Sequence, residues 1–261
     1  MKITIKMLLS MLVFYLFWFF LATIPWINLF KIDQIKKSSE EKIGSFIWEA
    51  TRNNEKEYKD TFMLKSIDSI IDKICVSNQI SSSKIKLHML QSEVENAFTL
   101  PDGHLVLYTS LVYACESETE LAGVIAHEIA HIKLNHVMEK LSAEIGLGVL
   151  LSALSSNNPI ILNEAVQLLS STAYSRSLED EADHNAIEYM MKSKINPMGL
   201  ADFLIRLSNK NDNGLSILST HPNTRERVKS IKSQIRSYSK NRQFQRVLNQ
   251  STWDHCKSSQ H

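Results

Sequence analysis

The sequence Leu121–His136, LAGVIAHEIAHIKLNH, carries the most informative pattern of this 261-residue chain. Within it, His127 and His131 are four residues apart, and Glu128 directly follows the first histidine. On a helix, residues four apart lie on one face, so both imidazoles can reach a single metal ion. Glu128 is then close enough to hold a water molecule beside that ion and take its proton, as in zinc hydrolases. The pattern predicts His127 and His131 as zinc ligands and Glu128 as the catalytic base.

The residues around this motif predict a helix independently. Ser117-Glu118-Thr119-Glu120 is a capping box directly ahead of an apolar run. The apolar residues that follow repeat at helical spacing and give one broad face: Leu121, Val124, Ile125, Ile129 and Ile132. The helical pattern continues past His136 through Glu139 and Glu144, so one long helix is expected.

Composition describes an ordinary folded protein, with 44% hydrophobic and 22% charged residues. The formal net charge of +1 gives no reason to expect nucleic acid as a partner. Cys75, Cys115 and Cys256 are too few and too scattered for a disulfide framework or a cysteine-rich zinc site. Free buried thiols are expected, and a Cys75–Cys115 bridge stays open as the alternative.

Residues 7–30, MLLSMLVFYLFWFFLATIPWINLF, contain no charged side chain. As a helix this run would exceed the ~30 Å hydrocarbon thickness of a bilayer. A cleaved signal peptide is the alternative, but its apolar region is normally ~7–15 residues long and ends in a small-x-small site. We therefore predict one N-terminal transmembrane helix that contacts lipid through residues 7–30. Lysines flank the run on both sides, so the charges do not fix its orientation.

The rest of the chain reads as an α+β, mostly helical domain. The predicted divisions are an anchor over 1–30, a juxtamembrane linker or helix over 31–60, a catalytic domain over 61–240 and a polar tail over 241–261, which is expected to be loose from Gln250. Residues 85–89, 96–100 and 104–108 have the spacing of strands, with a turn at Pro101-Asp102-Gly103. They predict a small antiparallel sheet beside the metal helix. His88 and His104 are expected to be surface or cross-strand residues, not ligands.

Two later stretches concern the site. The uncharged Ile145–Leu154 is too short to span a bilayer, and is expected to be a buried helix or a flap near the cleft, with a membrane-dipping hairpin as the alternative. Ser177–Met191 is a predicted helix that begins with a capping box, Ser177-x-x-Asp180. Helix-dipole complementarity could explain its acidic first turns. However, Glu179 and Asp183 share a face, so one can bind the metal while the other orients a ligand imidazole.

Four ordered blocks resemble the HtpX-like zinc metallopeptidases, which include the CAAX prenyl protease and BepA types. The blocks are Asn96-Ala97-Phe98-x-Leu100-Pro101-x-Gly103, His127-Glu128-x-x-His131, Ser175-Arg176-x-x-Glu179-x-x-Ala182-Asp183 and Ser219-Thr220-His221-Pro222-x-Thr224-x-x-Arg227. The resemblance implies a zincin-like fold of the gluzincin type, with Glu179 as the third zinc ligand and Asp183 as the partner of a ligand. It also implies that His221 lies close to the active site, where it either gates the site or assists the transition state.

Together these features predict a membrane-anchored zinc endopeptidase with one Zn²⁺ per chain and a polypeptide substrate. The edge strand at Asn96, Ala97 and Phe98 is the expected place for an extended peptide to bind. By analogy, the substrates are unfolded or damaged proteins of a bacterial cell envelope, with the catalytic domain outside the cytoplasm. A metal-stabilised, membrane-tethered chaperone without proteolysis is the alternative class, and hydrolysis of a small ester or amide fits the same metal chemistry.

Overall fold

The computed structural model describes residues 32–156, 158–209, 217–222, 224–238 and 243–258, together with Met11, Phe14, Tyr15 and Trp18. The chain divides at Glu40, and the fold below is that of residues 41–261. Within the described ranges, no helix has both the length and the hydropathy needed to cross a bilayer. The predicted span over 7–30 lies outside these ranges apart from the four single residues, and it stays a prediction.

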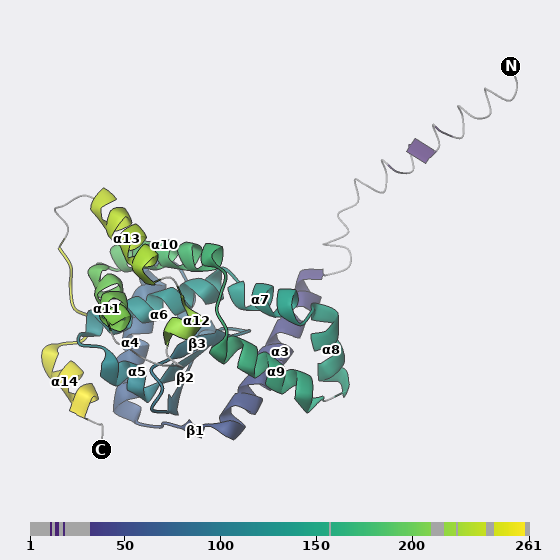
Figure 1. Ribbon diagram of the computed structural model, residues 1–261, viewed down its shortest axis with the longest axis horizontal. Coiled ribbons are helices and arrows are strands. Elements are labelled where there is room, and N and C mark those ends of the chain that lie inside the picture. The colour runs from purple at the N-terminus through teal and green to yellow at the C-terminus, as the bar shows by residue number, and fades with distance from the viewer. Residues whose placement is uncertain are drawn as a thin grey trace, which may run out of the picture. The chain divides into compact units, whose positions relative to one another are not determined.

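Helices make up most of the described chain, as expected (Figure 1). Those of the first half are α3 (Ile32–Asn54), α4 (Thr61–Ser77), the short 3₁₀ helix η1 (Ser82–Lys84), α5 (Thr109–Ala114) and α6 (Glu118–Lys133). Those of the second half are α7 (His136–Glu144), α8 (Leu147–Ser156), α9 (Pro159–Ser171), α10 (Arg176–Lys192), α11 (Met198–Asn209), α12 (Ile217–Thr220), α13 (Thr224–Ser237) and α14 (Gln250–Ser258).

The described residues also form one four-stranded sheet, in the order β1-β2-β4-β3. Its strands are β1 (Lys56–Glu57), β2 (Lys86–Gln91), β3 (Ala97–Leu100) and β4 (His104–Tyr108). The expected hairpin joins β3 to β4, but β4 lies between β3 and β2 and runs parallel to β2. The prediction of an antiparallel sheet is therefore wrong in one pairing, because β3 forms in the crossover between two parallel strands.

Alternate residues of the buried strands face two different layers of helices. On β4, Leu105 and Leu107 join the core made with α4, α6, α10 and α11. Val106 and Tyr108 point to the opposite face, into a second core made with the later part of α3 and with α7, α8 and α9. Both faces of the sheet are thus covered, which explains why every residue of β3 and β4 is buried.

Helix α6 lies between the sheet and helices α10 and α11 (Figure 1). It begins as predicted, with Ser117 Oγ accepting a hydrogen bond from the Glu120 backbone N–H. It ends earlier than predicted, because Asn135 takes a left-handed conformation (φ 62°) that starts the separate helix α7. Asparagine tolerates this conformation better than most residues. The expected single long helix is therefore two helices with a sharp turn between them.

Two further helices differ from expectation. Helix α10 is capped by Ser175, whose Oγ accepts from the Leu178 backbone N–H, so the predicted box at Ser177 is two residues too late. The uncharged stretch after α7 forms α8, in which Leu150 and Ala153 are buried while other apolar residues are exposed. Of the two expected forms, the buried core helix is therefore wrong, and the flap near the cleft stays a prediction.

The C-terminal segment is also more ordered than the sequence suggested. Helix α14 places Trp253 and Cys256, three residues apart, on one face that packs into the core. The buried Glu118 of α6 accepts hydrogen bonds from the backbone N–H groups of Val247 and Leu248 at 3.1 and 3.2 Å. The prediction of a loose tail is thus wrong for residues 250–258. All three cysteines are buried and unpaired, which confirms the free-thiol interpretation.

The crossing of α6 and α11 depends on a missing side chain at Gly123. A Cβ atom there would lie 2.8 Å from the backbone N and Cα of Leu200. We expect Gly123→Ala to lower the free energy of unfolding by about 1–3 kcal/mol, because α11 must move away from the metal helix. Gly148→Ala on α8 is the matched control, since a Cβ atom at Gly148 would meet none of the described residues within 4 Å. The control should be neutral or slightly stabilising. Chemical unfolding of the full-length protein measures both, and equal stability of the two variants would contradict this account of the crossing.

Candidate metal centre and active site

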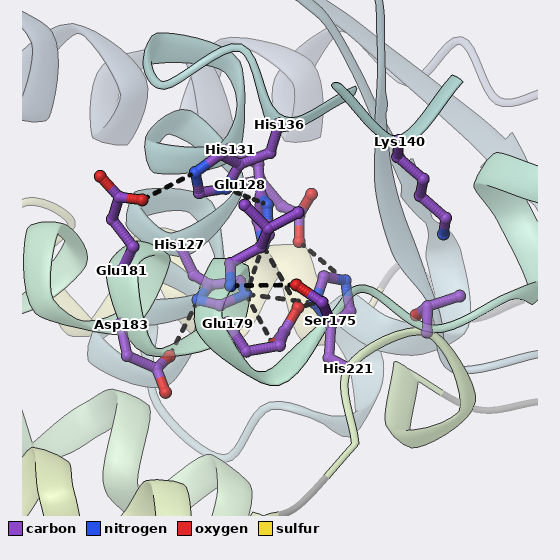
Figure 2. Close-up of polar contacts among 12 residues, drawn as sticks. His127, Glu128, His131, His136, Lys140, Ser175, Glu179, Glu181, Asp183 and His221 are labelled. Carbon is purple, nitrogen blue, oxygen red and sulfur yellow. Dashed lines mark hydrogen bonds and ion pairs between the residues drawn. The ribbon is translucent and has the colours of Figure 1, made fainter. Parts of the chain in front are cut away.

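Three segments that are distant in sequence bring the predicted site residues together (Figure 2). Helix α6 supplies His127 and His131 from one face, and α10, packed against it, supplies Glu179. His221 comes from the turn after α12. Within the described residues, one donor atom from each of these four side chains lies within 4.8 Å of all the others.

The spacing of these atoms fits a small tetrahedral metal ion. Ligand atoms about 2.0–2.1 Å from a tetrahedral zinc lie about 3.3 Å from one another. Here His127 Nε2 is 3.0 Å from His131 Nε2 and 3.5 Å from Glu179 Oε2. His131 Nε2 is 3.4 Å from Glu179 Oε1, and His221 Nδ1 is 3.2 Å from His127 Nε2. Two or three imidazoles with one carboxylate are also a ligand set that zinc prefers.

Asp183 and Arg227 support this donor set from behind. Asp183 Oδ1 lies 2.9 Å from His127 Nδ1, the ring nitrogen that faces away from the donor set. Arg227 donates two hydrogen bonds of 2.7 Å to the two oxygens of Asp183. Its Nη1 also lies 2.8 Å from Glu179 Oε2 and donates to the backbone carbonyl of His221. One buried guanidinium thus contacts three of the side chains or turns that build the site.

These contacts keep buried carboxylates ionised. Burial alone would raise the pKa of Glu179, but His221 and Arg227 hold it well below its ordinary value. Burial would likewise raise the pKa of Asp183, but Arg227 lowers that pKa to about 2. Burial opposes the charged form of His127, yet Asp183 and Glu179 raise its pKa to about 9. A negative environment of this kind attracts a cation to the donor set.

Glu128 is placed differently from the other acids. It is fully buried, and within the described residues neither of its carboxylate oxygens has a hydrogen-bond partner. His221 Nε2 lies 3.4 Å from its Oε1. Burial raises the pKa of Glu128 above its ordinary value, which improves its ability to accept a proton near neutral pH. A buried carboxylate without a hydrogen bond is costly, and both oxygens of Glu128 are available to hold a reacting water molecule.

The site is closed to solvent. His127, Glu128, His131, Glu179 and His221 are each 3% exposed or less. The cavity that touches His127 and His221 measures about 10 Å³, which leaves no room for a peptide. The turn that carries His221 is held by the Tyr174 backbone N–H, which donates to the Thr220 carbonyl.

Sequence reasoning overlooked several residues around the site. Arg227 appears in the sequence analysis only as the last residue of a quoted block, and no role in the site is expected for it. Tyr174 stacks on His131, with ring centroids 4.2 Å apart, and its hydroxyl has no hydrogen-bond partner among the described residues. Lys140 of α7 is buried, lies over the Tyr174 ring and donates to the Thr172 carbonyl. A usable signal existed for Arg227 and Tyr174, since Arg227 ends one of the four quoted blocks and Tyr174 directly precedes another.

The predicted substrate strand lies beside α6 but is enclosed. Within the described sheet, β3 is an edge strand without a partner on its outer side. Asn96, Ala97 and Phe98 are nevertheless buried. The Asn96 amide donates to the Ser170 carbonyl at the end of α9 and accepts from the Thr220 hydroxyl. The side chain of Asn96 is therefore already hydrogen-bonded to the ends of α9 and α12.

His88 and His104 do not join the metal centre. Their rings are hydrogen-bonded, with His88 Nε2 2.9 Å from His104 Nδ1, on the neighbouring strands β2 and β4. Trp48 of α3 stacks on His88 at a centroid distance of 3.7 Å. The interpretation of both as cross-strand histidines is confirmed.

Comparisons with known proteins agree with this geometry. The chain is 27% identical over 175 residues to "Mitochondrial metalloendopeptidase OMA1" of Schizosaccharomyces pombe, which covers 63% of this chain and 51% of that protein. It is 26% identical over 203 residues to "Putative beta-barrel assembly-enhancing protease" of Vibrio cholerae. This alignment covers 72% of this chain and 42% of that protein. It is 24% identical over 171 residues to "Metalloprotease YcaL" of Escherichia coli. This alignment covers 62% of this chain and 66% of that protein.

The chain thus spans about half the length of the first two relatives. A family model described as Peptidase family M48 matches residues 64–235, which include all of the clustered site residues. The resemblance to HtpX-like and BepA-like metallopeptidases is confirmed. The chain belongs to peptidase family M48.

Proposed function

We propose that this chain is a zinc-dependent endopeptidase in which His127, His131 and Glu179 hold one Zn²⁺ and Glu128 is the base. The observation that carries the proposal is the buried Glu128 carboxylate on α6, which has no hydrogen bond among the described residues and lies directly beside a donor set spaced for a tetrahedral ion. A purely structural zinc site uses four protein ligands and needs no base. The pairing of a base with the donor set therefore favours hydrolysis.

The proposed mechanism assigns a task to each side chain. When bound, zinc polarises the scissile carbonyl and lowers the pKa of an attacking water molecule. Glu128 orients that water, accepts its proton and later passes the proton to the leaving amine. Asp183 fixes His127 through its Nδ1, and Arg227 neutralises part of the buried negative charge. Each of these groups is held by packing before substrate arrives, so little reorganisation is needed during the reaction.

His221 is proposed to gate the site. Its Nδ1 lies 2.8 Å from Glu179 Oε1 and 3.2 Å from His127 Nε2, within the donor set. A fourth protein donor at that place would compete with the attacking water for the open position that a catalytic zinc requires. The buried site and the small cavity are consistent with a resting form. Withdrawal of the His221 turn would then create the space for water and for a peptide.

Peptide substrates are proposed to bind along the outer edge of β3. An edge strand accepts an extended chain through backbone hydrogen bonds, which tolerate many side chains. Because α9 and the α12 turn enclose Asn96, binding at this edge requires that these segments move. Such tolerance suits the clearance of unfolded or damaged proteins. The names of the relatives from Vibrio cholerae, Yersinia pestis and Escherichia coli, beta-barrel assembly-enhancing proteases, support a role in a bacterial cell envelope.

The alternative is a membrane-tethered chaperone or assembly factor that holds a metal but does not cleave. It shares the donor set and the family with the enzyme, but it gives no reason for a buried carboxylate at Glu128 that lacks a hydrogen bond among the described residues. We therefore favour proteolysis, with the catalytic domain outside the cytoplasm.

Replacement of the base tests the enzymatic proposal. Glu128→Gln keeps the shape of the side chain and both histidines but removes the proton acceptor. We expect cleavage of a casein-type substrate to fall by about 10²–10⁴-fold, with zinc content unchanged. Glu144→Gln, an exposed acid at the end of α7, is the control and should retain full activity. Cleavage by Glu128→Gln at the wild-type rate would refute the mechanism and favour the chaperone.

Replacement of His221 tests the proposed gate and should raise cleavage, whereas replacement of Glu128 should lower it. His221→Ala should raise basal cleavage while zinc content is preserved, because water gains the fourth position. His184→Ala, at an exposed histidine of α10, is the control and should change neither quantity. A fall in turnover with zinc retained would instead assign His221 to stabilisation of the transition state. Activity and zinc content that both match wild type would exclude His221 from the site.

The anchor is tested by fractionation. We propose that residues 7–30 hold the mature chain in the membrane, and four described side chains of this stretch, Met11, Phe14, Tyr15 and Trp18, are between 62% and 68% exposed. Such apolar side chains are suited to contact with lipid. The full-length protein should stay with membranes after an alkaline carbonate wash. Recovery of a shorter soluble product that begins after residue 30 would identify a cleaved signal peptide instead.

A further inference from the structure

A third buried histidine of the α6–α7 region contacts the metal centre from outside (Figure 2). His136 is the first residue of α7 and is 2% exposed. Its Nδ1 lies 3.0 Å from His131 Nδ1, with the two rings edge to face. The left-handed turn at Asn135 folds the chain back so that this contact forms five residues after His131. A continuous helix, as the sequence alone suggested, would not turn the chain in this way.

This contact determines which nitrogen of each ring carries the proton. His131 directs its Nε2 at the donor set, 3.0 Å from His127 Nε2 and 3.4 Å from Glu179 Oε1. A neutral imidazole that offers the lone pair of Nε2 carries its proton on Nδ1. That proton lies on the side of His136, whose Nδ1 must then be the acceptor. His136 in turn carries its own proton on Nε2, which lies 3.5 Å from Glu181 Oε2.

We propose that His136 is a positioning residue that fixes the tautomer and orientation of His131 for metal binding. The inference rests on the proposed zinc site. The two histidine ligands then have outer partners of different kinds. His127 Nδ1 faces the carboxylate of Asp183, 2.9 Å away, whereas His131 Nδ1 faces a neutral ring. Outer partners of this kind hold a ligand ring in place and raise its basicity.

Charge explains why an imidazole suits this position. Glu128, Glu179 and Asp183 are buried acids within one small region, and Arg227 contacts two of them. Another buried carboxylate beside His131 would add negative charge and a further desolvation cost. His136 accepts the hydrogen bond without adding that charge. The acid at the far end, Glu181, is 54% exposed, so water can replace its contact with His136.

Two substitutions separate hydrogen bonding from packing. His136→Phe keeps a ring of similar size but has no acceptor. His136→Asn loses volume, yet its Oδ1 can occupy the place of Nδ1 and accept from His131. We expect the zinc dissociation constant, measured in the full-length protein by competition with a chelator, to rise about 10–100-fold in His136→Phe. In His136→Asn it should stay within about threefold of wild type. Thermal unfolding of the metal-free proteins provides the second readout.

The controls make each outcome decisive. His104→Phe alters another histidine pair, in which His104 is buried, on the opposite face of the sheet, and should leave zinc affinity unchanged. Wild-type affinity in His136→Phe, or weaker binding in His136→Asn than in His136→Phe, would overturn the inference and leave only a packing role. If wild-type protein bound no zinc, both the proposed function and the inference about His136 would fail. If wild type bound zinc and cleaved substrate while His136→Phe did so equally well, this inference alone would fail.

Discussion

The structure depends on one electrostatic constraint: several ionisable side chains must be buried together where α6 packs against α10. Burying a carboxylate without compensation is costly, so each acid needs a partner or a task. Arg227 supplies the compensation, because its guanidinium contacts Asp183 and Glu179 and also holds the backbone of His221. Gly123 lets α6 approach α11 closely, and the Ser175 cap sets where α10 begins. Both features help to position these side chains relative to one another.

This arrangement assigns different environments to chemically similar groups. Glu179 and Asp183 are held ionised by positive neighbours, whereas burial raises the pKa of Glu128. The first pair is therefore suited to bind and orient, and the third acid is suited to accept a proton. The same logic separates the two proposed histidine ligands, one backed by a carboxylate and one by an imidazole. In the proposed mechanism, the segments around α9 and α12 enclose the site, so substrate access depends on movement of His221.

The sequence allowed much of the site to be predicted, and the reasons for the failures are physical. Spacing of four residues on a helix depends on local geometry, so the histidine pair, and the shared face of Glu179 and Asp183, could be read directly. Arg227 could not, because its burial depends on tertiary packing that a basic helical pattern does not encode. The contact between His136 and His131 requires the left-handed conformation of Asn135. Asparagine permits this conformation, but its presence in the sequence does not predict it. Strand pairing failed for the same reason, since the order of strands is set by long-range contacts.

The central claim is that α6 and α10 together hold the metal through His127, His131 and Glu179. The most direct measurement is the zinc content of purified full-length protein after dialysis against a weak chelator, compared for two neighbouring acids of α10. Wild type and Glu181→Gln should retain about one zinc ion per chain, because Glu181 is half exposed and lies outside the donor set. Glu179→Gln should lose most of it, since an amide is a poor substitute for the buried carboxylate. Loss of zinc in Glu181→Gln with retention in Glu179→Gln would contradict the account.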